Sequence, residues 1–328
     1  MKTYSRLYAG RRRLSDYEIV SSDLHYTYPS RFELGDGSPV VQWYREFREG
    51  SQLRVRTWAA FSDPRQTTYT SYTALQDRRE RVVDDLFAEI DETAYDDQLD
   101  DGWVSFLHKH YFPLRFPLHG LEMLAAYVGQ MAPSSRITNC AAFQAADELR
   151  RLQRIAYRTA QLGVHRPGDD PVEHRTGWEE GASFEPLREL IERALIRYDW
   201  AEAFVLLNVV IKPRLDRWIN RELAAALAYA NSDPVLRSVH FSLGQDNEWH
   251  RKWTAAALHV AIADHPVNAE LVPRWVAEWR PLADRAVDAL AAVASQAPQP
   301  LTATEIGNRI VAGAEADVEA MLGTHRSA

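Results

Sequence analysis

Two short patterns in the chain could do chemistry, because each nearly matches the Glu-x-x-His spacing that binds iron in four-helix carboxylate proteins. Residues three apart on an α-helix share a face, so a carboxylate and an imidazole at this spacing can hold one metal ion. The first pattern is Glu148-x-x-Arg151, with a guanidinium where the imidazole is needed. The second, about a hundred residues later, is Asn247-x-x-His250, with an amide where the carboxylate is needed.

Neither pattern fits iron as it stands. Arg151 keeps its proton and cannot become a ligand, and the neutral amide of Asn247 contributes no charge toward holding a metal. None of the eleven histidines has an Asp or Glu three residues before it. We therefore predict no catalytic, cofactor-binding or metal-ligating residue in this chain. In place of a metal we expect a vestigial polar cluster, since buried charges need partners. Its members would be Glu148, Arg151, Asp246, Asn247 and His250.

The elements that must position these residues are long helices. Residues 140–162 and 245–258 are rich in Ala, Leu, Arg and Gln and contain no Gly or Pro, which favours helix. Apolar residues recur at helical spacing in 64–90, and residues 203–211 are apolar on nearly every side, which is typical of a buried helix. No stretch alternates β-branched and polar residues over a useful length. The sequence predicts an all-α fold.

Local signals predict where helices start and stop. Asp63-Pro64 and Asp233-Pro234 are typical helix starts, with Asp as N-cap and Pro in the first turn. Ser183 could cap another helix, and Thr302-x-x-Glu305 has the spacing of a capping box. Pro213 is expected to kink or end the helix before it. The acidic segment 91–101 is interpreted as a solvated turn.

Three regions follow from these signals. Residues 61–295 form the helical domain, with a Gly- and Pro-rich linker near 163–183. Residues 296–328 form a C-terminal linker and short helix. Residues 1–60 form an extended arm whose many Tyr and Trp residues argue against a solvated tail. The arm could fold back over its own helices or reach across a partner subunit.

Composition limits the function further. The net charge of −8 is spread along the chain, which argues against nucleic-acid binding. A single cysteine, Cys140, excludes an internal disulfide and a Cys zinc site, and fits the cytoplasm. No signal peptide or membrane span is visible in the sequence. Arg and aromatic residues are abundant together, which is the composition of protein–protein interfaces, although a GC-rich genome would explain the Arg excess equally well.

Several long segments make the chain resemble a known family. They are YAGRRRLSDYEIVSSDLHYTY (8–28), WAAFSDPRQTTYTSYTALQDRRE (58–80), MAPSSRITNCAAFQAADELR (131–150), LIERALIRYDWAEAF (190–204) and WVAEWRPLADRAV (275–287). The chain resembles the β subunit of the hydroxylase of soluble bacterial multicomponent monooxygenases. Within that family it is most similar to the four-component toluene, alkene and isoprene group.

The resemblance implies a ferritin-like, ribonucleotide-reductase-like bundle of long helices in which the diiron site is absent. The implied role is a structural scaffold, since in this family the α subunit carries the diiron centre and oxidises an aromatic or alkene substrate with O2. The α and γ hydroxylase subunits are the implied partners, in an (αβγ)2 assembly. An effector protein, a Rieske ferredoxin and an NADH-dependent reductase are implied to act on that assembly.

Two other functions stay open at this point. One is an iron oxidase in its own right with an unusual ligand set, namely Glu122, Glu148, Glu202 and His250. That set is short of the roughly six protein ligands of a ferritin-like site. The other is a free-standing helical binding protein. Metal content would test the first function, and size-exclusion behaviour of the chain alone would test the second.

Overall fold

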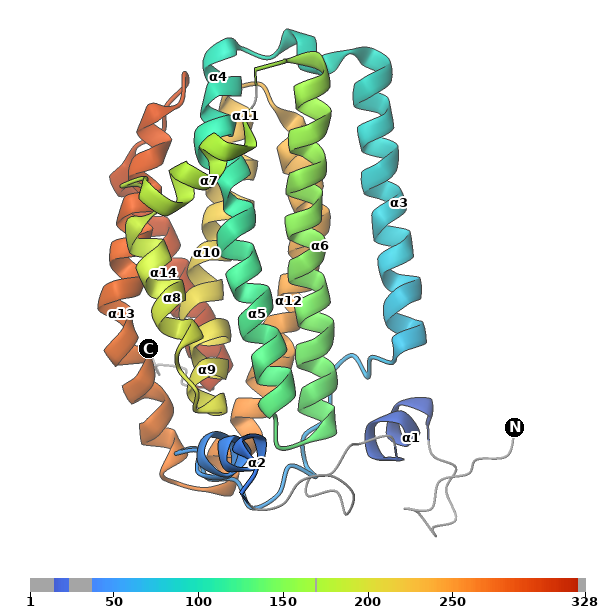
Figure 1. Ribbon diagram of the computed structural model, residues 1–328, viewed down its shortest axis with the longest axis vertical. Helices are drawn as coiled ribbons and strands as arrows, with labels where there is room; N and C mark the ends of the chain where they lie inside the picture. Colours follow the sequence, from blue (N-terminus) through green and yellow to red (C-terminus); the bar gives the residue numbers. More distant parts are fainter. Residues whose placement is uncertain (1–14, 24–36, 169, 324–328) are drawn as a thin grey trace.

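Long helices lie side by side along the longest axis of the molecule, with shorter segments closing its two ends (Figure 1). The structure, a computed structural model, describes residues 15–23, 37–168 and 170–323. Every regular element in these ranges is helical, as the sequence predicts. The α-helices are α1 (Asp16–Asp23), α2 (Pro39–Tyr44), α3 (Tyr69–Thr93), α4 (Asp101–Phe106), α5 (Arg115–Met131), α6 (Ser135–His165), α7 (Pro171–Glu180), α8 (Glu185–Leu195), α9 (Trp200–Val205), α10 (Lys212–Arg217), α11 (Ala228–Ala230), α12 (Pro234–Asp264), α13 (Asn268–Val293) and α14 (Ala303–Leu322).

Wider and tighter turns join several of these helices. The π-helical segments are η1 (Arg45–Glu49), η3 (Leu107–Tyr111), η5 (Leu206–Ile211) and η6 (Trp218–Leu227), and the 3₁₀ segments are η2 (Tyr95–Gln98), η4 (Phe112–Leu114) and η7 (Ala294–Gln296). From Trp200 to Ala230 the chain is helical without a break. Every residue of η5 is buried, which confirms the prediction of a helix surrounded by core.

The prediction that Pro213 ends this helix is wrong, and that of a kink is not tested. Proline lacks the N–H that an α-helix needs, and it clashes with the preceding turn. The backbone widens to the π-helical pairing of η5 just before Lys212-Pro213, and α10 follows without a gap in the helical run. Widened turns of this kind recur at functional sites. Here the turn leads directly into α10, which carries the buried residues Lys212 and Asp216.

The expected start of α3 at Pro64 is five residues too early. The helix begins at Tyr69, and the Thr68 side chain caps it by accepting from Ser71 N–H. Asp63 instead accepts hydrogen bonds from the backbone N–H groups of Arg65 and Thr67, so it closes a turn. An Asp-Pro pair starts a turn as readily as a helix, which the local sequence alone does not separate.

The acidic segment 91–101 is not a solvated turn throughout. Helix α3 continues to Thr93, and the Asp96 side chain is fully buried. Asp96 pairs with Arg158 of α6, with 2.6 Å between Oδ2 and Nη1. The interpretation was wrong because the partner of Asp96 lies far away in sequence.

Three other boundary predictions differ from the structure, and one is confirmed. The Gly- and Pro-rich stretch 163–183 contains the end of α6 and all of α7. Helix α8 has Phe184, not Ser183, at its N-cap. Helix α14 spans 20 residues, and Thr302 makes no side-chain hydrogen bond at its start. Asp233 caps α12 as predicted, accepting from the N–H groups of two residues in the first turn.

The described part of the N-terminal arm packs against its own bundle. The Ser51 hydroxyl donates to Asp199 at 2.6 Å, and the backbone N–H of Arg54 donates to Asn268 at 3.0 Å. Val41 and Leu53 are buried. Much of the predicted arm, residues 1–14 and 24–36, lies outside the described residues, so its reach across a partner stays a prediction. In the described ranges no helix combines the length and apolar character needed to cross a membrane.

Candidate functional site

A closed cluster of four charges lies at the centre of the bundle, between α6 and α10. Arg151 Nη1 donates to Glu148 Oε2 and to Asp216 Oδ1, at 2.8 Å in each case. Lys212 Nζ donates to the other oxygen of Glu148 and lies 3.2 Å from Asp216 Oδ2. Glu148 and Arg151 have no solvent exposure, and Lys212 and Asp216 have almost none. We call these four residues the central cluster; its formal charge is zero.

Helical spacing places these side chains. Glu148 and Arg151 are three apart on α6, and Lys212 and Asp216 are four apart on α10, so each pair shares one face of its helix. Burial raises the pKa of Glu148, but Lys212 and Arg151 outweigh burial and hold that pKa below its usual value. The pKa of Asp216 is lowered in the same way, by Lys212 and then Arg151, against the effect of burial. Both carboxylates therefore stay ionised.

Asn247 and His250 of α12 border the central cluster. Asn247 Oδ1 lies 3.4 Å from Lys212 Nζ. His250 Nδ1 lies 3.8 Å from Glu148 Oε1, and its Nε2 lies 3.0 Å from Asp147 Oδ2. Burial first, and then Lys212, lowers the pKa of His250 to about 3, so the imidazole is neutral.

Asp147 links this region to α3. Its Oδ1 accepts from the Tyr72 hydroxyl at 2.8 Å and from the Gln76 amide at 2.7 Å. Burial raises the pKa of Asp147 to about 7. Gln76 also donates to Asp246 Oδ1 at 2.9 Å. Asp147 Oδ2 and His250 Nε2 therefore lie where they can share one proton. Asp147 Oδ1 links α6 to α3 through Tyr72 and Gln76.

Asp246 is held by two arginines. Arg150 Nη1 donates to its Oδ2 at 2.8 Å, and Arg79 Nη1 donates to its Oδ1. Arg150 also pairs with Glu80 of α3. These ion pairs connect α3, α6 and α12, so each carboxylate of the region has at least one cation or donor beside it.

The structure brings together all five residues of the predicted cluster. Arg151 pairs with Glu148 and Asp216, and Asp246 pairs with Arg79 and Arg150. The sequence reasoning missed charged members of the network on α6 and α10, namely Asp147, Arg150, Lys212 and Asp216, and the α3 side chains that bind to it. One signal could have found two of them, because Lys212 and Asp216 stand four apart directly after an apolar helical segment, and the chain has few lysines.

The alternative iron-ligand set is not assembled. Glu122 pairs with His119 on its own helix, at 3.3 Å. Glu202 accepts from Trp279 Nε1 at 3.1 Å. Among the described residues, no group of three or more His, Cys, Asp or Glu side chains is arranged to hold a metal ion.

The donor set at the centre of the bundle does not fit iron. The oxygens of Glu148 that could bind a metal are already occupied by the ammonium of Lys212 and the guanidinium of Arg151. A cation placed there would be repelled by both groups, and the guanidinium keeps its proton, since Glu148 and Asp216 raise the pKa of Arg151 against the effect of burial. The cluster can neutralise charge and fix helices relative to one another, and it offers no open coordination position.

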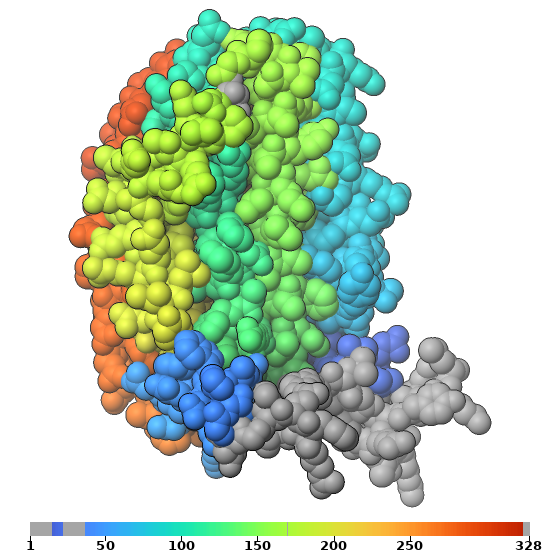
Figure 2. All heavy atoms as spheres, in the orientation of Figure 1, coloured from blue at the N-terminus to red at the C-terminus, as the bar shows by residue number. Residues whose placement is uncertain are grey.

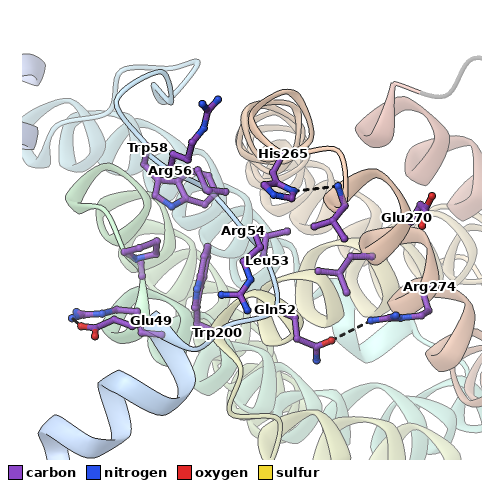
Figure 3. Close-up of a pocket in the computed structure, with 16 residues that line it drawn as sticks. Glu49, Gln52, Leu53, Arg54, Arg56, Trp58, Trp200, His265, Glu270 and Arg274 are labelled. Atoms are coloured by element: carbon purple, nitrogen blue, oxygen red, sulfur yellow. Dashed lines mark hydrogen bonds and ion pairs between the residues drawn. The ribbon is translucent and has the colours of Figure 1, made fainter.

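A groove of about 1020 Å³ lies elsewhere, at the end of the bundle near α2. Figure 3 shows Arg54 in it between Trp200 and Arg274, with Trp58 and His265 along its walls. Gln52 and Arg274 are joined across it by a 3.1 Å hydrogen bond. None of the central-cluster residues lines this groove, so the groove and the cluster are separate features.

These observations define a class of protein: a ferritin-like helical bundle with buried ion pairs at its centre. The sequence profile described as methane/phenol/alkene hydroxylase matches residues 43–265. The chain belongs to this hydroxylase family, and it is a hydroxylase-component subunit rather than a protein of another family with the same fold. The family resemblance and the ferritin-like fold stated from the sequence are thereby confirmed.

Named relatives agree with this assignment. The toluene-4-monooxygenase hydroxylase component subunit beta of Ectopseudomonas mendocina is 40% identical over 293 residues, covering 88% of this chain and 89% of the relative. The propane 2-monooxygenase hydroxylase component small subunit of Gordonia sp. is 22% identical and covers 90% and 82%.

Two solved structures are similar to this chain. One is toluene 4-monooxygenase with toluene bound in its resting active site, with a TM-score of 0.81 and 39% identity over 85% of this chain and 94% of that chain. The other is xenon-pressurised phenol hydroxylase from Pseudomonas sp. OX1, with a TM-score of 0.81, 18% identity and coverage of 94% and 91%. The second likeness supports the fold alone.

Proposed function

We propose that this chain is the non-catalytic scaffold β subunit of a hydroxylase whose partner α subunit carries the diiron centre. The assembled hydroxylase would insert oxygen from O2 into an aromatic or alkene substrate. The observation that carries the proposal is the position of Lys212 and Arg151. They donate hydrogen bonds to both oxygens of Glu148, the oxygens that a metal pair would need as ligands. The site residues would be a degenerate metal centre that now serves the fold.

The charge balance of the central cluster supports a structural role. Two buried carboxylates, Glu148 and Asp216, are matched by two buried cations, Lys212 and Arg151. A buried charge without a partner costs several kcal/mol, so the match of charges keeps this burial from destabilising the helix packing. Ligands on a catalytic partner must be held within fractions of an ångström, and a rigid neighbouring bundle would supply that support.

The remaining partners of the proposal come from the family resemblance. A γ subunit would complete an (αβγ)2 hydroxylase, and an effector protein, a Rieske ferredoxin and an NADH-dependent reductase would act on it in the cytoplasm. The subunit names of the relatives support a multi-subunit assembly. No contact of this chain with the ferredoxin or the reductase is part of the proposal.

Metal analysis of the assembled hydroxylase tests the proposal directly. The chain is co-expressed with a candidate α subunit, a larger hydroxylase chain that carries two Glu-x-x-His motifs, and the complex is then separated into subunits under mild denaturant. Iron is expected with the larger subunit and below about a tenth of an equivalent with this chain. Stoichiometric iron on this chain, held after separation, would overturn the scaffold assignment.

Turnover by assembled variants gives a second test. Arg151→Ala and His250→Ala should lower the yield or stability of the complex, because each leaves buried partners unpaired. At equal iron content in the partner, the complexes that do assemble should keep most of their turnover. Loss of nearly all activity at full iron occupancy and normal assembly would mean that this chain takes a direct part in catalysis.

The free-standing binding protein is distinguished by association behaviour. Expressed alone, a chain that works without partners should be monodisperse and bind no hydroxylase subunit. The proposed β subunit should instead co-purify with the larger subunit in a fixed ratio, measured by size exclusion with light scattering.

A further inference from the structure

Helix α6 carries its charges inside and its uncharged residues outside, the reverse of an ordinary surface helix. Between Ala142 and Val164 every side chain that is not buried is uncharged. All six charged residues of that stretch are buried: Asp147, Glu148, Arg150, Arg151, Arg154 and Arg158. Large apolar side chains stand on the outside, with Val164 79% exposed, Tyr157 48% and Leu149 41%.

The uncharged surface continues onto the neighbouring helix. Helices α5 and α6 pack along their length and lie side by side on the face of the molecule seen in Figures 1 and 2. The outward residues of 123–130 on α5 are also uncharged, including Met123 at 39% exposure. We call the outward residues of 123–130 and 142–164 the α5–α6 face.

The adjoining helix shows how unusual this face is. Helix α3 stands at its edge in Figure 1, and the outward positions of α3 include Asp77, Arg78 and Asp84. That mixture of charges is what a solvated helix carries. Charged residues make up 26% of the whole chain, so their absence from the outward positions of 123–130 and 142–164 sets the α5–α6 face apart as a surface made for burial.

The shape of the face favours a helix as its occupant. Ala142 and Ala146 stand one turn apart, and so do Ala156 and Ala160, which leaves room for the ridge of another helix to approach closely. The stretch 142–164 is about 35 Å long at 1.5 Å per residue. The α5 stretch 123–130 adds about 12 Å of a second helix, so two strips roughly 10 Å wide give on the order of 500 Å², a large part of the ~800 Å² per partner of a stable interface.

We propose that the α5–α6 face is the surface on which a partner hydroxylase subunit docks through an uncharged pair of helices. This inference rests on the proposed function, because it presumes that the chain works in a multi-subunit hydroxylase. A charged or extended segment would leave the large side chains of Leu149 and Tyr157 unmatched. A membrane is disfavoured because the flanking carboxylates of α3 and the net charge of −8 oppose contact with anionic lipid.

Oxidative footprinting of the assembled wild-type hydroxylase tests the inference without altering the fold. Met123 and Tyr157 should be modified at least fivefold more slowly than their exposure in the single chain implies. Tyr229, which is 66% exposed on α11, serves as the comparison residue. Modification of Met123 and Tyr157 at the rate of freely exposed side chains would overturn the proposed docking surface.

Charge insertion gives a matched test by co-purification. The variant A146E/L149E places two carboxylates on the α5–α6 face, and burying them unpaired should weaken association with the tagged partner subunit at least tenfold. A277E on α13 and V82E on α3 add the same charge at exposed positions elsewhere and should stay within twofold of wild type. Equal weakening by V82E and A277E, or none by A146E/L149E, would refute the surface.

Other outcomes separate this inference from the proposed function. If the wild-type chain binds the partner and the α5–α6 variants bind equally well, only the docking surface is wrong. If the wild-type chain binds no hydroxylase subunit at all, the proposed function fails and the inference fails with it. A homodimer of this chain that A146E/L149E converts to a monomer would assign the face to a second copy instead. Flotation of the wild-type chain, but not A146E/L149E, with vesicles of phosphatidylcholine and phosphatidylserine would assign it to a membrane.

Discussion

Helix α6 makes two kinds of ion pair on its inner side. Toward α10 it forms the central cluster, in which Glu148 and Arg151 are wholly buried. Toward α3 it forms a seam in which Arg154 pairs with Glu80 and Asp84, whose side chains are 31% and 61% exposed. An arginine of α6 pairs with a Glu and an Asp in both places. The contact with water differs, and that difference sets how much each pair can contribute.

The two regions therefore have different tasks. Charges taken fully out of water repay their desolvation only when every partner is present, so the central cluster is expected to be intolerant of single losses. Exposed pairs are screened by water and salt and contribute little individually. Helix α3 packs its apolar residues, among them Val83 and Phe87, against α12. The seam would then orient α3 beside α6 rather than hold the whole fold together.

Removing the ammonium from the central cluster is expected to have the largest effect. Lys212→Met keeps a similar side-chain volume but leaves Glu148 and Asp216 with Arg151 as their one remaining cation. The expected loss is about 3–5 kcal/mol in the free energy of unfolding, measured by urea denaturation of the hydroxylase subunit. A loss below about 1 kcal/mol would show that the buried pair is not a structural requirement.

Matched variants sharpen this prediction. Lys252→Met removes the same group from an exposed pair, in which Lys252 and Glu248 lie 2.6 Å apart with both side chains more than half exposed. Its expected cost is below about 0.5 kcal/mol. The double variant E148Q/K212M restores a neutral cluster, so its cost should be smaller than the sum of the two single costs. Strict additivity would mean that the two residues do not interact.

The titrations of Asp147 and His250 should cancel in the pH dependence of the free energy of unfolding. In the folded chain Asp147 keeps its proton up to a pKa of about 7, and His250 stays neutral down to a pKa of about 3. In the unfolded chain Asp147 loses its proton near 3.8 and His250 gains one below 6.5. Between about pH 4 and 6.5 each state of the pair thus binds one proton, and the pair adds no slope to stability.

Single substitutions should expose two opposite slopes. In Asp147→Asn the unfolded state binds one more proton than the folded state, so stability should rise with pH between about 4 and 6.5. In His250→Asn the folded state binds the extra proton at Asp147, so stability should fall over the same range. Each slope approaches about 1.4 kcal/mol per pH unit, measured by urea denaturation at a series of pH values. Slopes of the same sign in both variants would contradict the proposed proton sharing.

The sequence predicted the helices well and their partners poorly. Regular spacing of apolar residues is a local property, and it was enough for the all-α fold and for α6 and α12. The two near-miss patterns also pointed to the correct centre of the bundle. The pairing of Arg151 with Asp216 and the burial of Asp96 depend on residues about 60 positions apart, which no local pattern encodes.

The outer side of α6 is a second feature that depends on distant residues and that local sequence patterns do not predict. The α6 sequence predicts an ordinary helix rich in Ala, Leu, Arg and Gln, and does not show which side is buried. Only the packing reveals that these arginines point inward, because α3, α10 and α12 supply carboxylates for them. Which face of such a helix is buried follows from its neighbours, and so the α5–α6 face could not be read from the sequence.

Loosening the α3 seam is expected to have the smallest effect. Arg154→Met removes the pairs with Glu80 and Asp84, and half-exposed pairs of this kind contribute about 1 kcal/mol or less. Hydrogen exchange of the α3 amides, residues 69–93, should become up to about tenfold faster, while exchange in α12 stays unchanged. Arg175→Met, which breaks an exposed pair with Glu179 on α7, serves as the control.

Salt should reproduce part of this effect in the wild-type chain. Raising NaCl from about 0.05 to 0.5 M shortens the screening length to a few ångströms, which weakens the exposed seam more than the buried cluster. Exchange of the α3 amides should therefore speed up with salt, and the added effect should be smaller in Arg154→Met. Salt-independent exchange in α3 would mean that its apolar contact with α12, rather than the seam, keeps it in place.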